Sequence, residues 1–596
     1  MSLEMLMIFS EQDIKIIEAV TLDGKCFNDN QKEFINLFET KYIIAGPGVG
    51  KTTCLSAKIV LMLMKMASEN SRDAICIITH TNVAVDEINR ILNRMGISKI
   101  KHPHFVGTIH QFFNTYLALP YIKKKLNPKN IRFSKEEDYS SILSFLVNKS
   151  SYFSNWATAA LIKIKASKLV YDKQLGQITL ENTSNWDKFD KHKSKMLNLK
   201  LDLKKRGYFS FEDTFLFAQA AIENDNNIRI LRKRFKYVFI DEFQDTNPQS
   251  IDIIKKIFMN KGNVLQFIGD PNQTLDFDGE KPEVDPGITF ELKVCNRFGA
   301  NIARHLPIII NGVNIQSLNE IVSFDPLMII YKENKELIPF YKEILMECNY
   351  NKDFAKSKRK DSILSIRKDT IQQFEFGRNT QNITGYIPKS TEAYTQHLLK
   401  LINELIYKKI SSLKSIDFDL KNWIKEHPNQ MDIKKTLISD IKLKKLNVST
   451  LRNIINLILN EQISNSINST NEIFHKIENI INIMNGKNND KLQSEKETNG
   501  NLVFGTIHSA KGETHRSVLL IDSEKSKMIH TNMLKSFYCN NDINYDDKWV
   551  EKNLLYVAMS RPTHLFAFGM KESQISSENI QIFKDKGWDI RYTNSH

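Results

Sequence analysis

Short apolar runs alternate with longer amphipathic stretches along this chain, and the pattern predicts an α/β fold. Lys41–Gly46 (KYIIAG) is a β-rich apolar run that passes directly into CLSAKIVLMLMKM, which has helical spacing. Tyr237–Ile240 (YVFI) is apolar throughout, as expected of a parallel strand that is buried on both faces. The later runs DPLMIIY and DSILSIRK, within Ile302–Asn379, predict further strands.

Two long intervals have helical spacing instead. Tyr121–Lys205 is helix-like and carries two basic clusters, YIKKKLNPK and DKHKSKMLNLKLDLKKRG, the second of which runs just past its end. Gly385–Asn499 is rich in Ile, Leu, Lys and Asn, and Asn485–Asn501 predicts a flexible linker. The basic clusters fit either a solvated helical face or contact with a nucleic acid strand.

Size and charge narrow the class of protein. The chain has 596 residues, too many for one hydrophobic core, so we expect several domains. Its 41% apolar and 26% charged residues are typical of an ordinary globular protein. A formal net charge of +14 favours a polyanionic partner such as nucleic acid, although a Lys- and Asn-rich chain can be basic for other reasons.

The cysteines and the apolar segments exclude other classes. No two cysteines have CxxC spacing, so neither a zinc site nor a disulfide framework is predicted, and a reducing compartment is expected. The opening MSLEMLMIFSEQD has no basic start and contains Glu4, unlike a signal peptide. Ile59–Ala67 is short and contains Lys65, which predicts a core helix and not a membrane span. We therefore expect a cytoplasmic protein without a membrane partner.

The segment GPGVGKTT has the composition of a loop that binds the phosphates of a nucleotide. It lies between the strand and the helix predicted around it, which is the context that such a loop needs. Lys51 would place a positive charge on the β- and γ-phosphates, and the Thr52 hydroxyl would ligate Mg²⁺. Ala45 stands where the common GxxxxGK[ST] pattern has its first glycine. The glycines that would let backbone N–H groups face the phosphates are Gly46, Gly48 and Gly50.

A pair of acids, Asp241 and Glu242, follows the apolar run YVFI. Ligands bind at the carboxyl ends of strands in open α/β sheets, so this pair is placed for chemistry. Asp241 suits coordination of Mg²⁺, and Glu242 suits activation of an attacking water. Together with the phosphate loop, the pair predicts hydrolysis of a nucleoside triphosphate, ATP, with Mg²⁺.

Eight further segments, in order, give the chain a family resemblance. They are FNDNQKEFI, IITHTNVAVDEI, VGTIHQF, GYFSFEDTF, IGDPNQTLDFDG, NRFGANI, TIHSAKGETH and LLYVAMSRPTHLFAF. With them the chain resembles the UvrD/Rep-type DNA helicases of superfamily 1 from about residue 27 to residue 568.

The resemblance implies an α/β fold of two RecA-like P-loop domains, each with a mainly helical inserted subdomain. The first domain would comprise residues 1–112 and 206–284 and hold the ATP site, with residues 113–205 as its insertion. The second would comprise residues 285–382 and 500–596, with residues 383–499 as its insertion.

The resemblance also implies roles at the nucleotide. Gln31 would hydrogen-bond the adenine edge and Gln273 would sense the γ-phosphate. Arg297 and Arg561 would act as arginine fingers, and their distance in sequence from Lys51 suggests that the second domain supplies them. Arginines reaching across a cleft would tie its closure to the γ-phosphate. Thr53 and Glu513 complete the set of residues expected to contact the nucleotide.

Other residues of the matching motifs would face single-stranded or tailed DNA. In the family these motifs contact the strand, and histidines and aromatic residues can stack on its bases. His80, His110 and His508 could instead be satisfied within the protein. The residues expected at the DNA are Thr79, His80, Asn82, Thr108, His110, Phe277, Thr506 and His508.

Four departures from the family pattern affect the expected activity. Asn296 and Thr53 replace an aromatic residue and an arginine that sandwich adenine in the family, so nucleotide selectivity should be looser. The run Asp276–Asp278 is shorter than its family counterpart and keeps only Phe277 to stack on a base. The ribose-binding glutamate of the family is displaced to Glu513. These changes leave hydrolysis intact but weaken the case for efficient unwinding of a duplex.

The function predicted first is an ATP-dependent DNA helicase or translocase that moves 3′ to 5′ on single-stranded DNA. The alternative is a DNA-sensing regulatory ATPase subunit that controls a partner nuclease, for example in antiphage defence. A motor directed to RNA is a third possibility in principle, and equal stimulation of the ATPase by DNA and RNA would favour it.

Overall fold

The computed structural model describes residues 8–22, 24–79, 82–96, 100–133, 136–183, 185–275, 282–318, 322–376, 502–539 and 545–593. The chain divides into one unit of Met1–Gly377 with Val503–His596 and a second of Arg378–Leu502. The predicted helices of Gly385–Asn499 and the predicted linker at Asn485–Asn501 lie outside the described residues.

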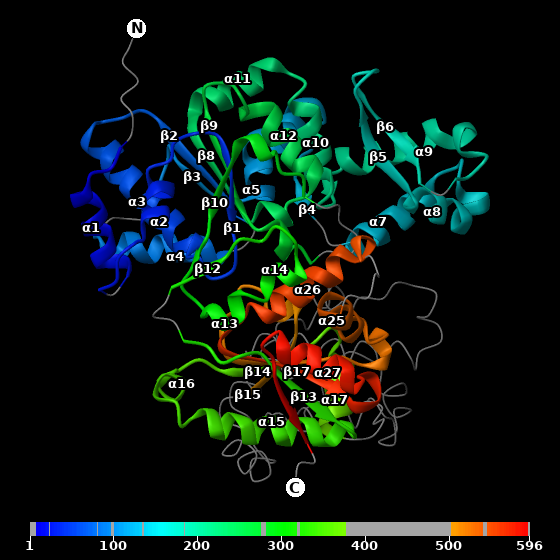
Figure 1. Cartoon of the computed structure of the whole chain (residues 1–596). Helices are drawn as coiled ribbons and strands as arrows, with labels where there is room; N and C mark the ends of the chain where they lie inside the picture. The colour runs from blue at the N-terminus through cyan, green and yellow to red at the C-terminus, as the bar shows by residue number, and fades with distance from the viewer. Residues whose placement is uncertain are drawn as a thin grey trace, which may run out of the picture. The chain divides into compact units, whose positions relative to one another are not determined.

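The N-terminal part of the first unit is built on a parallel six-stranded sheet with the strand order β10-β1-β9-β8-β2-β3 (Figure 1). In this sheet Ile44 pairs with Gly269, and Asp241 pairs with Ile268. The carboxyl ends of β1, β8 and β9 therefore share one edge, where three predicted motifs follow their strands. The strands are β1 (Lys41–Ala45), β2 (Ala74–Thr79), β3 (Phe105–Thr108), β8 (Phe235–Asp241), β9 (Val264–Gly269) and β10 (Thr289–Leu292).

Alternating side chains of the central strand β8 bury the two faces of this sheet in two cores. Tyr237 and Phe239 pack on the side of α1–α4, whereas Val238 and Ile240 pack on the side of α5, α10, α11 and α12. This explains why the run YVFI has no polar position. The helices are α1 (Glu11–Thr21), α2 (Asp29–Ile35), α3 (Lys51–Ser68), α4 (Asn82–Arg94), α5 (Ile109–Phe113), α10 (Asp213–Ala221), α11 (Asp225–Arg234) and α12 (Pro248–Phe258).

A buried lysine, Lys58 of α3, fastens the end of α2 to the sheet. Its ammonium group donates to the carbonyl oxygens of Phe34 and Leu37, and lies 3.1 Å from Oε1 of Gln266 on β9. The rings of Phe34 and Phe38 lie 4.8 and 4.6 Å from the nitrogen. Burial lowers the pKa of Lys58, and these acceptors and rings compensate for its lost hydration.

The segment predicted to be helical at Tyr121–Lys205 also contains strands. Ser167–Asp172 (β5) and Gln177–Asn182 (β6) form an antiparallel hairpin, and its turn includes Gly176 at φ 61°. A separate hydrophobic cluster joins the hairpin to α7, α8 and α9. The other elements here are η1 (Asn114–Ala118), α6 (Leu119–Lys125), β4 (Arg132–Phe133, paired with β7, Tyr208–Phe209), α7 (Glu136–Lys149), η2 (Ser154–Trp156), α8 (Ala157–Lys165) and α9 (Phe189–Lys205).

The C-terminal part of the first unit contains another six-stranded sheet, of order β15-β14-β16-β17-β13-β18. Within this sheet, the pairs β14–β16, β16–β17, β17–β13 and β13–β18 are parallel. Both strand runs predicted within Ile302–Asn379 are present, as β13 and β14. The strands are β13 (Leu327–Tyr331), β14 (Asp361–Ser365), β15 (Leu502–Thr506), β16 (His515–Ile521), β17 (Pro562–Lys571) and β18 (Asp589–Tyr592), and a separate pair is formed by β11 (Val294–Cys295) and β12 (Gln316–Ser317).

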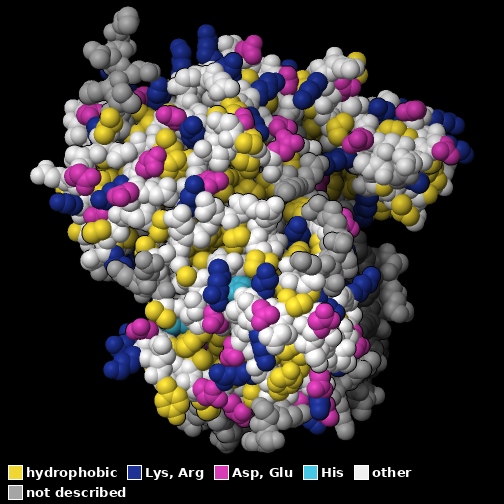
Figure 2. All heavy atoms as spheres, viewed as in Figure 1, with side chains coloured by type: hydrophobic (Ala, Val, Ile, Leu, Met, Phe, Trp, Pro, Cys, Tyr) yellow, Lys and Arg dark blue, Asp and Glu magenta, His cyan; other side chains and the backbone are white. Residues whose placement is uncertain are grey.

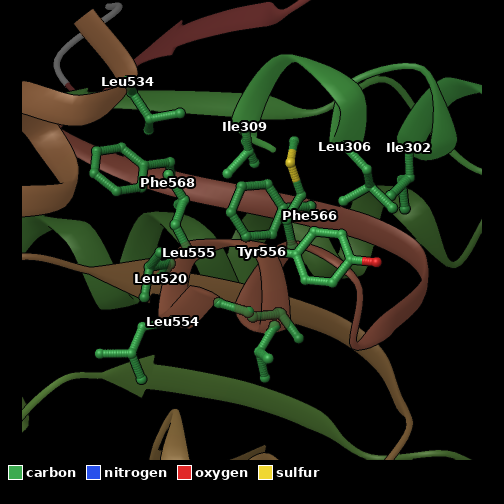
Figure 3. Close-up of a cluster of buried hydrophobic side chains, with 14 of the residues drawn as sticks. Ile302, Leu306, Ile309, Leu520, Leu534, Leu554, Leu555, Tyr556, Phe566 and Phe568 are labelled. Carbon is green, nitrogen blue, oxygen red and sulfur yellow. The ribbon is translucent and has the colours of Figure 1, made fainter. Parts of the chain in front are cut away.

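One large hydrophobic core packs helices against this sheet. Figure 3 shows Leu554 and Leu555 of α26 beside Phe566 and Phe568 of β17, with Leu534 of α25 nearby. All of these side chains are almost fully buried. The helices are α13 (Ala300–Ala303), α14 (Leu306–Ile309), α15 (Asn334–Cys348), α16 (Lys352–Lys356), α17 (Lys368–Phe376), α25 (Ile529–Cys539), α26 (Trp549–Met559) and α27 (Ser577–Asp585).

The α/β class with parallel sheets, predicted from the apolar pattern, is therefore confirmed. The apolar run Ile59–Ala67 lies within α3 and is mostly buried, as predicted for a core helix. Across the described residues, no helix is both long and apolar enough to cross a bilayer. On the face drawn in Figure 2, Lys and Arg side chains lie among Asp and Glu side chains.

Replacing Lys58 with Met tests the contribution of this lysine to stability. The variant removes the charged donor that the carbonyls of Phe34 and Leu37 share with Oε1 of Gln266, which should cost about 2 kcal/mol even though Leu37 keeps a bond from Nε2 of Gln266. For a domain of this size, that cost corresponds to a fall of ~4–8 °C in melting temperature. Differential scanning calorimetry measures it, with Lys65→Met as the control, because the half-buried Lys65 of the same helix donates to the exposed carbonyl oxygen of Ile8. A melting temperature equal to that of the control would contradict the proposed role.

Candidate nucleotide site

The loop between β1 and α3 has the backbone shape that its glycines predict. Gly48 and Gly50 adopt left-handed conformations, with φ of 79° and 81°. A Cβ atom on Gly48 would lie 2.5 Å from Cβ of Arg297 and 2.7 Å from Sγ of Cys295. Glycine is thus required at this position both by conformation and by close packing. Helix α3 begins at Lys51, so its N-terminus opens into the loop and favours an anion there.

Lys51 lies between the two acids at the end of β8. Its Nζ atom is 3.2 Å from Oδ1 of Asp241 and also forms an ion pair with Glu242. Burial acts to lower the pKa of Lys51, but the two carboxylates outweigh it and leave the pKa raised. Burial raises the pKa of Asp241. Burial also acts to raise the pKa of Glu242, but Lys51, Gln244 and Lys511 together outweigh it and lower that pKa to about 2. The predicted lysine and acid pair therefore form one charged cluster.

Glu242 has an unusual backbone conformation. It adopts φ of 53°, which is uncommon for a residue with a side chain. The amide of Gln244 donates to Oε2 of Glu242, and Oε1 of Gln244 accepts from the N–H of Asp270 at 3.2 Å. Gln244 therefore links the ends of β8 and β9 and fixes the direction of the Glu242 carboxylate.

The donor groups at this edge suit a Mg²⁺ ion. Oδ1 of Asp241 is buried and accepts no hydrogen bond from the described residues, although Lys51 lies nearby. Thr52 carries a hydroxyl in the first turn of α3, next to Lys51 in the sequence. Carboxylate and hydroxyl oxygens are the hard ligands that Mg²⁺ prefers. Asp241 and Thr52 are therefore the residues that would hold the ion.

Arg561 and Arg297 come from the part of the unit that contains the other sheet and approach the same motifs. Nη2 of Arg561 donates to Oε1 of Gln273 at 3.0 Å, and Nε2 of Gln273 donates to Asp270 at 3.0 Å. Nη1 of Arg297 donates to the carbonyl oxygen of Ser560, next to Arg561. The structure thus brings together Gln273 and Arg561, which are almost three hundred positions apart in the sequence.

The electrostatics of these arginines favour an anionic ligand. Burial and the nearby charge of Arg297 lower the pKa of Arg561 to about 9. Burial lowers the pKa of Arg297 to about 10. Both groups remain charged at neutral pH, and neither forms an ion pair with an acid of the described residues. A phosphate group would compensate for both buried charges.

The remaining predicted nucleotide residues lie around this centre. Nε2 of Gln31 donates to the carbonyl oxygen of Val49 in the loop, and its Oε1 accepts from the N–H of Asn28. Gln31 therefore contacts the loop directly, and both ends of its amide are used by the protein. Thr53 lies in the first turn of α3. The carboxylate of Glu513 lies 3.3 Å from Nε2 of His515 and is exposed.

Two of the predicted DNA residues end neighbouring strands of the first sheet. Thr79 and Thr108 are paired in register at the carboxyl ends of β2 and β3. The Thr108 hydroxyl also accepts from the N–H of Gln111 and so caps α5. His110 packs edge-on against Phe215, with ring centroids 4.6 Å apart.

The other predicted DNA residues are only partly described. Thr506 ends β15, and Nε2 of His508 lies 3.1 Å from the carbonyl oxygen of Leu275. His508 thus contacts the segment after β9, a protein contact that the sequence does not indicate. Asn82 begins α4, but its side chain is not among those described. His80 and Phe277 lie outside the described residues.

Several residues of the site were quoted within motifs but not predicted to act. Lys511 donates to both carboxylate oxygens of Asp245, at 2.6 and 2.7 Å. Asp270, Gln244, Asn553 and Tyr556 also form contacts between segments distant in sequence. Lys511, Asp270 and Tyr556 stand in segments that carry the family resemblance, Gln244 and Asp245 follow the predicted acid pair, and Asn553 precedes its segment by one residue. Which atoms they contact depends on the packing of α26, which a single sequence does not give.

Comparison with known proteins agrees with this geometry. Residues 27–275 match the model of the UvrD/REP helicase N-terminal domain. Over 365 residues the chain is 26% identical to a probable DNA helicase II homolog of Mycoplasma capricolum subsp. capricolum, covering 58% of the chain and 47% of that protein. It is 27% identical over 265 residues to the ATP-dependent DNA helicase Rep of Buchnera aphidicola subsp. Schizaphis graminum, covering 43% of the chain and 38% of that protein. It is 24% identical over 262 residues to DNA helicase II of Haemophilus influenzae, covering 43% and 34%.

The strand-loop-helix segment and its acids define a P-loop nucleoside triphosphatase domain. Residues 27–275 therefore resemble the N-terminal domain of the UvrD-like helicases of superfamily 1, and the relatives include proteins named as ATP-dependent DNA helicases. The chain spans less than half the length of the three relatives described above.

A double-mutant cycle tests the charged cluster. Lys51→Met leaves Asp241 and Glu242 as neighbouring buried acids, and should lower the melting temperature by an amount that corresponds to about 2 kcal/mol. Adding Asp241→Asn should recover part of that loss, because one unpaired charge is removed. Thermal melting of the four proteins of the cycle measures the coupling. Strictly additive effects of the two substitutions would contradict the ion pair.

Proposed function

We propose that the chain binds ATP with Mg²⁺, hydrolyses it, and uses the cycle to move along single-stranded DNA. The observation that carries the proposal is the meeting of Lys51, Arg297 and Arg561 at one site. Lys51 pairs with Glu242, whose charge also acts on Arg561, and Arg297 packs against Gly48 of the loop. Among the residues that the structure describes, Lys51 pairs with the two acids at the end of β8 and neither arginine forms an ion pair, so the three charges make a site for a polyanion. The family relatives, named as ATP-dependent DNA helicases, support ATP as that polyanion.

In this proposal each residue has a separate task. Lys51 and the loop N–H groups bind the β- and γ-phosphates, while Glu242 accepts a proton from the attacking water. The left-handed backbone of Glu242 and its bond from Gln244 orient that base. Arg297 and Arg561 stabilise charge that develops on the transferred phosphoryl group. When bound, Mg²⁺ supplies further positive charge to the phosphates, and Thr52 and Asp241 would hold it.

We further infer that the two six-stranded sheets are the cores of two RecA-like domains. Their boundaries would be residues 1–112 with 206–284 and residues 285–382 with 500–596, and the insertions would be residues 113–205 and 383–499. Because arginines and P-loop come from different domains, the phosphates would draw the domains together and hydrolysis would release them. Such alternation is the step of a motor.

Contact with DNA is proposed at the carboxyl ends of β2 and β3. Thr79 and Thr108 lie side by side there, with His110 in the following helix. Thr506 and His508 would contact the strand from the other domain. Movement from 3′ to 5′ and unwinding of tailed duplexes are the finer parts of this proposal, and the family resemblance is their support.

ATP turnover is the direct test of hydrolysis. Single-stranded DNA should stimulate it about tenfold or more, because strand binding favours the closed state. Glu242→Gln should lower kcat about 10²–10⁴-fold because it removes the base. The matched control is Glu223→Gln, in an exposed pair with Lys256 away from β8. Turnover that persists in Glu242→Gln would refute the assigned site.

Separation of the DNA strands distinguishes a helicase from the regulatory alternative. Tailed duplexes with a 3′ overhang should be separated faster than those with a 5′ overhang if the chain moves 3′ to 5′. DNA-stimulated turnover without strand separation would instead support a DNA-sensing ATPase that acts on a partner nuclease. Equal stimulation by RNA and DNA would contradict a motor specific for DNA.

Arg561→Ala tests whether Arg561 acts on a nucleotide that is bound at the loop between β1 and α3. The substitution should lower kcat about 10³-fold, the size expected of an arginine finger. Arg304→Ala is the control, because Arg304 forms an exposed ion pair with Asp325. Stopped-flow measurement of bound nucleotide separates binding from turnover. A variant that loses affinity and turnover in equal proportion would not fit a transition-state role.

A further inference from the structure

Helix α26 presents one face to the segment that follows β9. We propose that Asn553 and Tyr556 on this face are positioning residues that hold the loop Asp270–Leu275, so that Gln273 meets Arg561 at the nucleotide site. The inference rests on the proposed ATPase, and it assigns a role to side chains that do not touch the nucleotide themselves.

Asn553 holds the backbone of the loop. Its side chain is buried, and Nδ2 donates to the carbonyl oxygen of Thr274 at 2.9 Å, with the carbonyl oxygen of Pro271 at 3.4 Å. These two carbonyls flank Gln273 on either side in the sequence. One amide group therefore fixes both ends of the turn that carries Gln273. An alanine here would remove the side-chain donor of the Thr274 carbonyl, while the carbonyl of Pro271 would keep the shorter bond from the Thr274 hydroxyl.

Tyr556 holds the side chain at the start of the same loop. Its hydroxyl donates to Oδ2 of Asp270 at 3.2 Å, and Oδ2 also accepts from Nε2 of Gln273 at 3.0 Å. The carboxylate is almost fully buried, so these two donors and the N–H of Asn272, which donates to Oδ1 at 3.0 Å, compensate for lost water. Tyr556 thus determines where Asp270 lies, and Asp270 determines how the amide of Gln273 is turned.

The opposite side of α26 gives the helix a rigid base. Leu554 and Leu555 are fully buried in the core around Phe566 and Phe568. In Figure 3 the hydroxyl oxygen of Tyr556 points away from this cluster of apolar side chains. Asn553 and Tyr556 lie three residues apart, so one helix face carries both contacts.

The same helix also leads to the arginine. Helix α26 ends at Met559, and Arg561 follows two residues later, with its Nε donating to the carbonyl oxygen of Val557. Helix α26 therefore holds both Arg561 and the loop that carries Gln273. Because one helix holds both groups, Arg561 can donate its 3.0 Å hydrogen bond to Gln273. A shift of the loop by one ångström would break it and leave nucleotide binding at Lys51 intact.

The test uses the full chain and separates turnover from binding. In Asn553→Ala, kcat for ATP should fall about tenfold, while the Kd for fluorescent ADP stays within about twofold, because only the arrangement used in the transition state is lost. Tyr556→Phe keeps the ring in the core and removes one donor, so kcat should fall about threefold to fivefold. Leu555→Ala, on the core side of α26, is the control for loss of stability and should keep kcat within about threefold.

Asn553→Asp gives a readout that packing alone would not change. The carboxylate has the size of the amide but cannot donate when ionised, so turnover at pH 8 should be as low as in the alanine variant. A carboxyl group facing carbonyl oxygens has a raised pKa, and its protonated form is a donor. Turnover relative to the unaltered protein should therefore rise as the pH falls from 8 to 6. A ratio that does not change with pH would overturn the donor role.

Hydrogen exchange of backbone amides tests the inference without a measurement of ATP turnover. Asn553→Ala should speed exchange of the amides at positions 272–275 about tenfold or more, because the loop loses its restraint. Unchanged exchange there, or a loss of kcat no greater than in Leu555→Ala at an equal fall in melting temperature, would overturn the inference. If the unaltered protein shows no ATPase, the proposed function fails, and the exchange result still decides whether α26 holds the loop.

Discussion

The structure depends on a set of buried positive charges that acids only partly balance. Lys51 is neutralised by the two acids after β8, whereas Arg297 and Arg561 donate mainly to carbonyl and amide oxygens of the protein. Burying a charge without a counter-charge is costly, and proteins keep such charges where a ligand supplies the counter-charge. The glycine loop, the acids at the end of β8 and the segment of α26 are arranged around these buried charges.

Local chemistry made much of this site predictable from the sequence. The strand before Gly46, the helix from Lys51 and the buried strand before Asp241 follow from apolar patterning and from loop composition. The parallel order of the strands then brings the segments after β1, β8 and β9 to one edge. The arginines were expected at the site only through family resemblance, because nothing local to positions 297 and 561 specifies what they face.

Other features depend on packing that a single sequence does not encode locally. The hairpin Ser167–Asn182 lies in a stretch whose Lys and Leu residues also satisfy helical spacing, and its turn at Gly176 was too weak a signal to overrule that pattern. Nothing local to Asn553 indicates that its side chain is buried against the loop that follows β9. His508 was expected to face DNA, and the structure adds a contact with the carbonyl oxygen of Leu275. In each case tertiary contacts decided between alternatives that the local sequence left equal.

The central claim is that a triphosphate bridges Lys51 on one side and the two arginines on the other. The most direct measurement is calorimetric titration of a non-hydrolysable ATP analogue and of ADP, each with Mg²⁺, into the unaltered protein and into Arg297→Ala/Arg561→Ala. The account predicts that the unaltered protein prefers the analogue by about tenfold or more and that the double variant binds both nucleotides with similar affinity. An undiminished preference for the triphosphate in the double variant would contradict it.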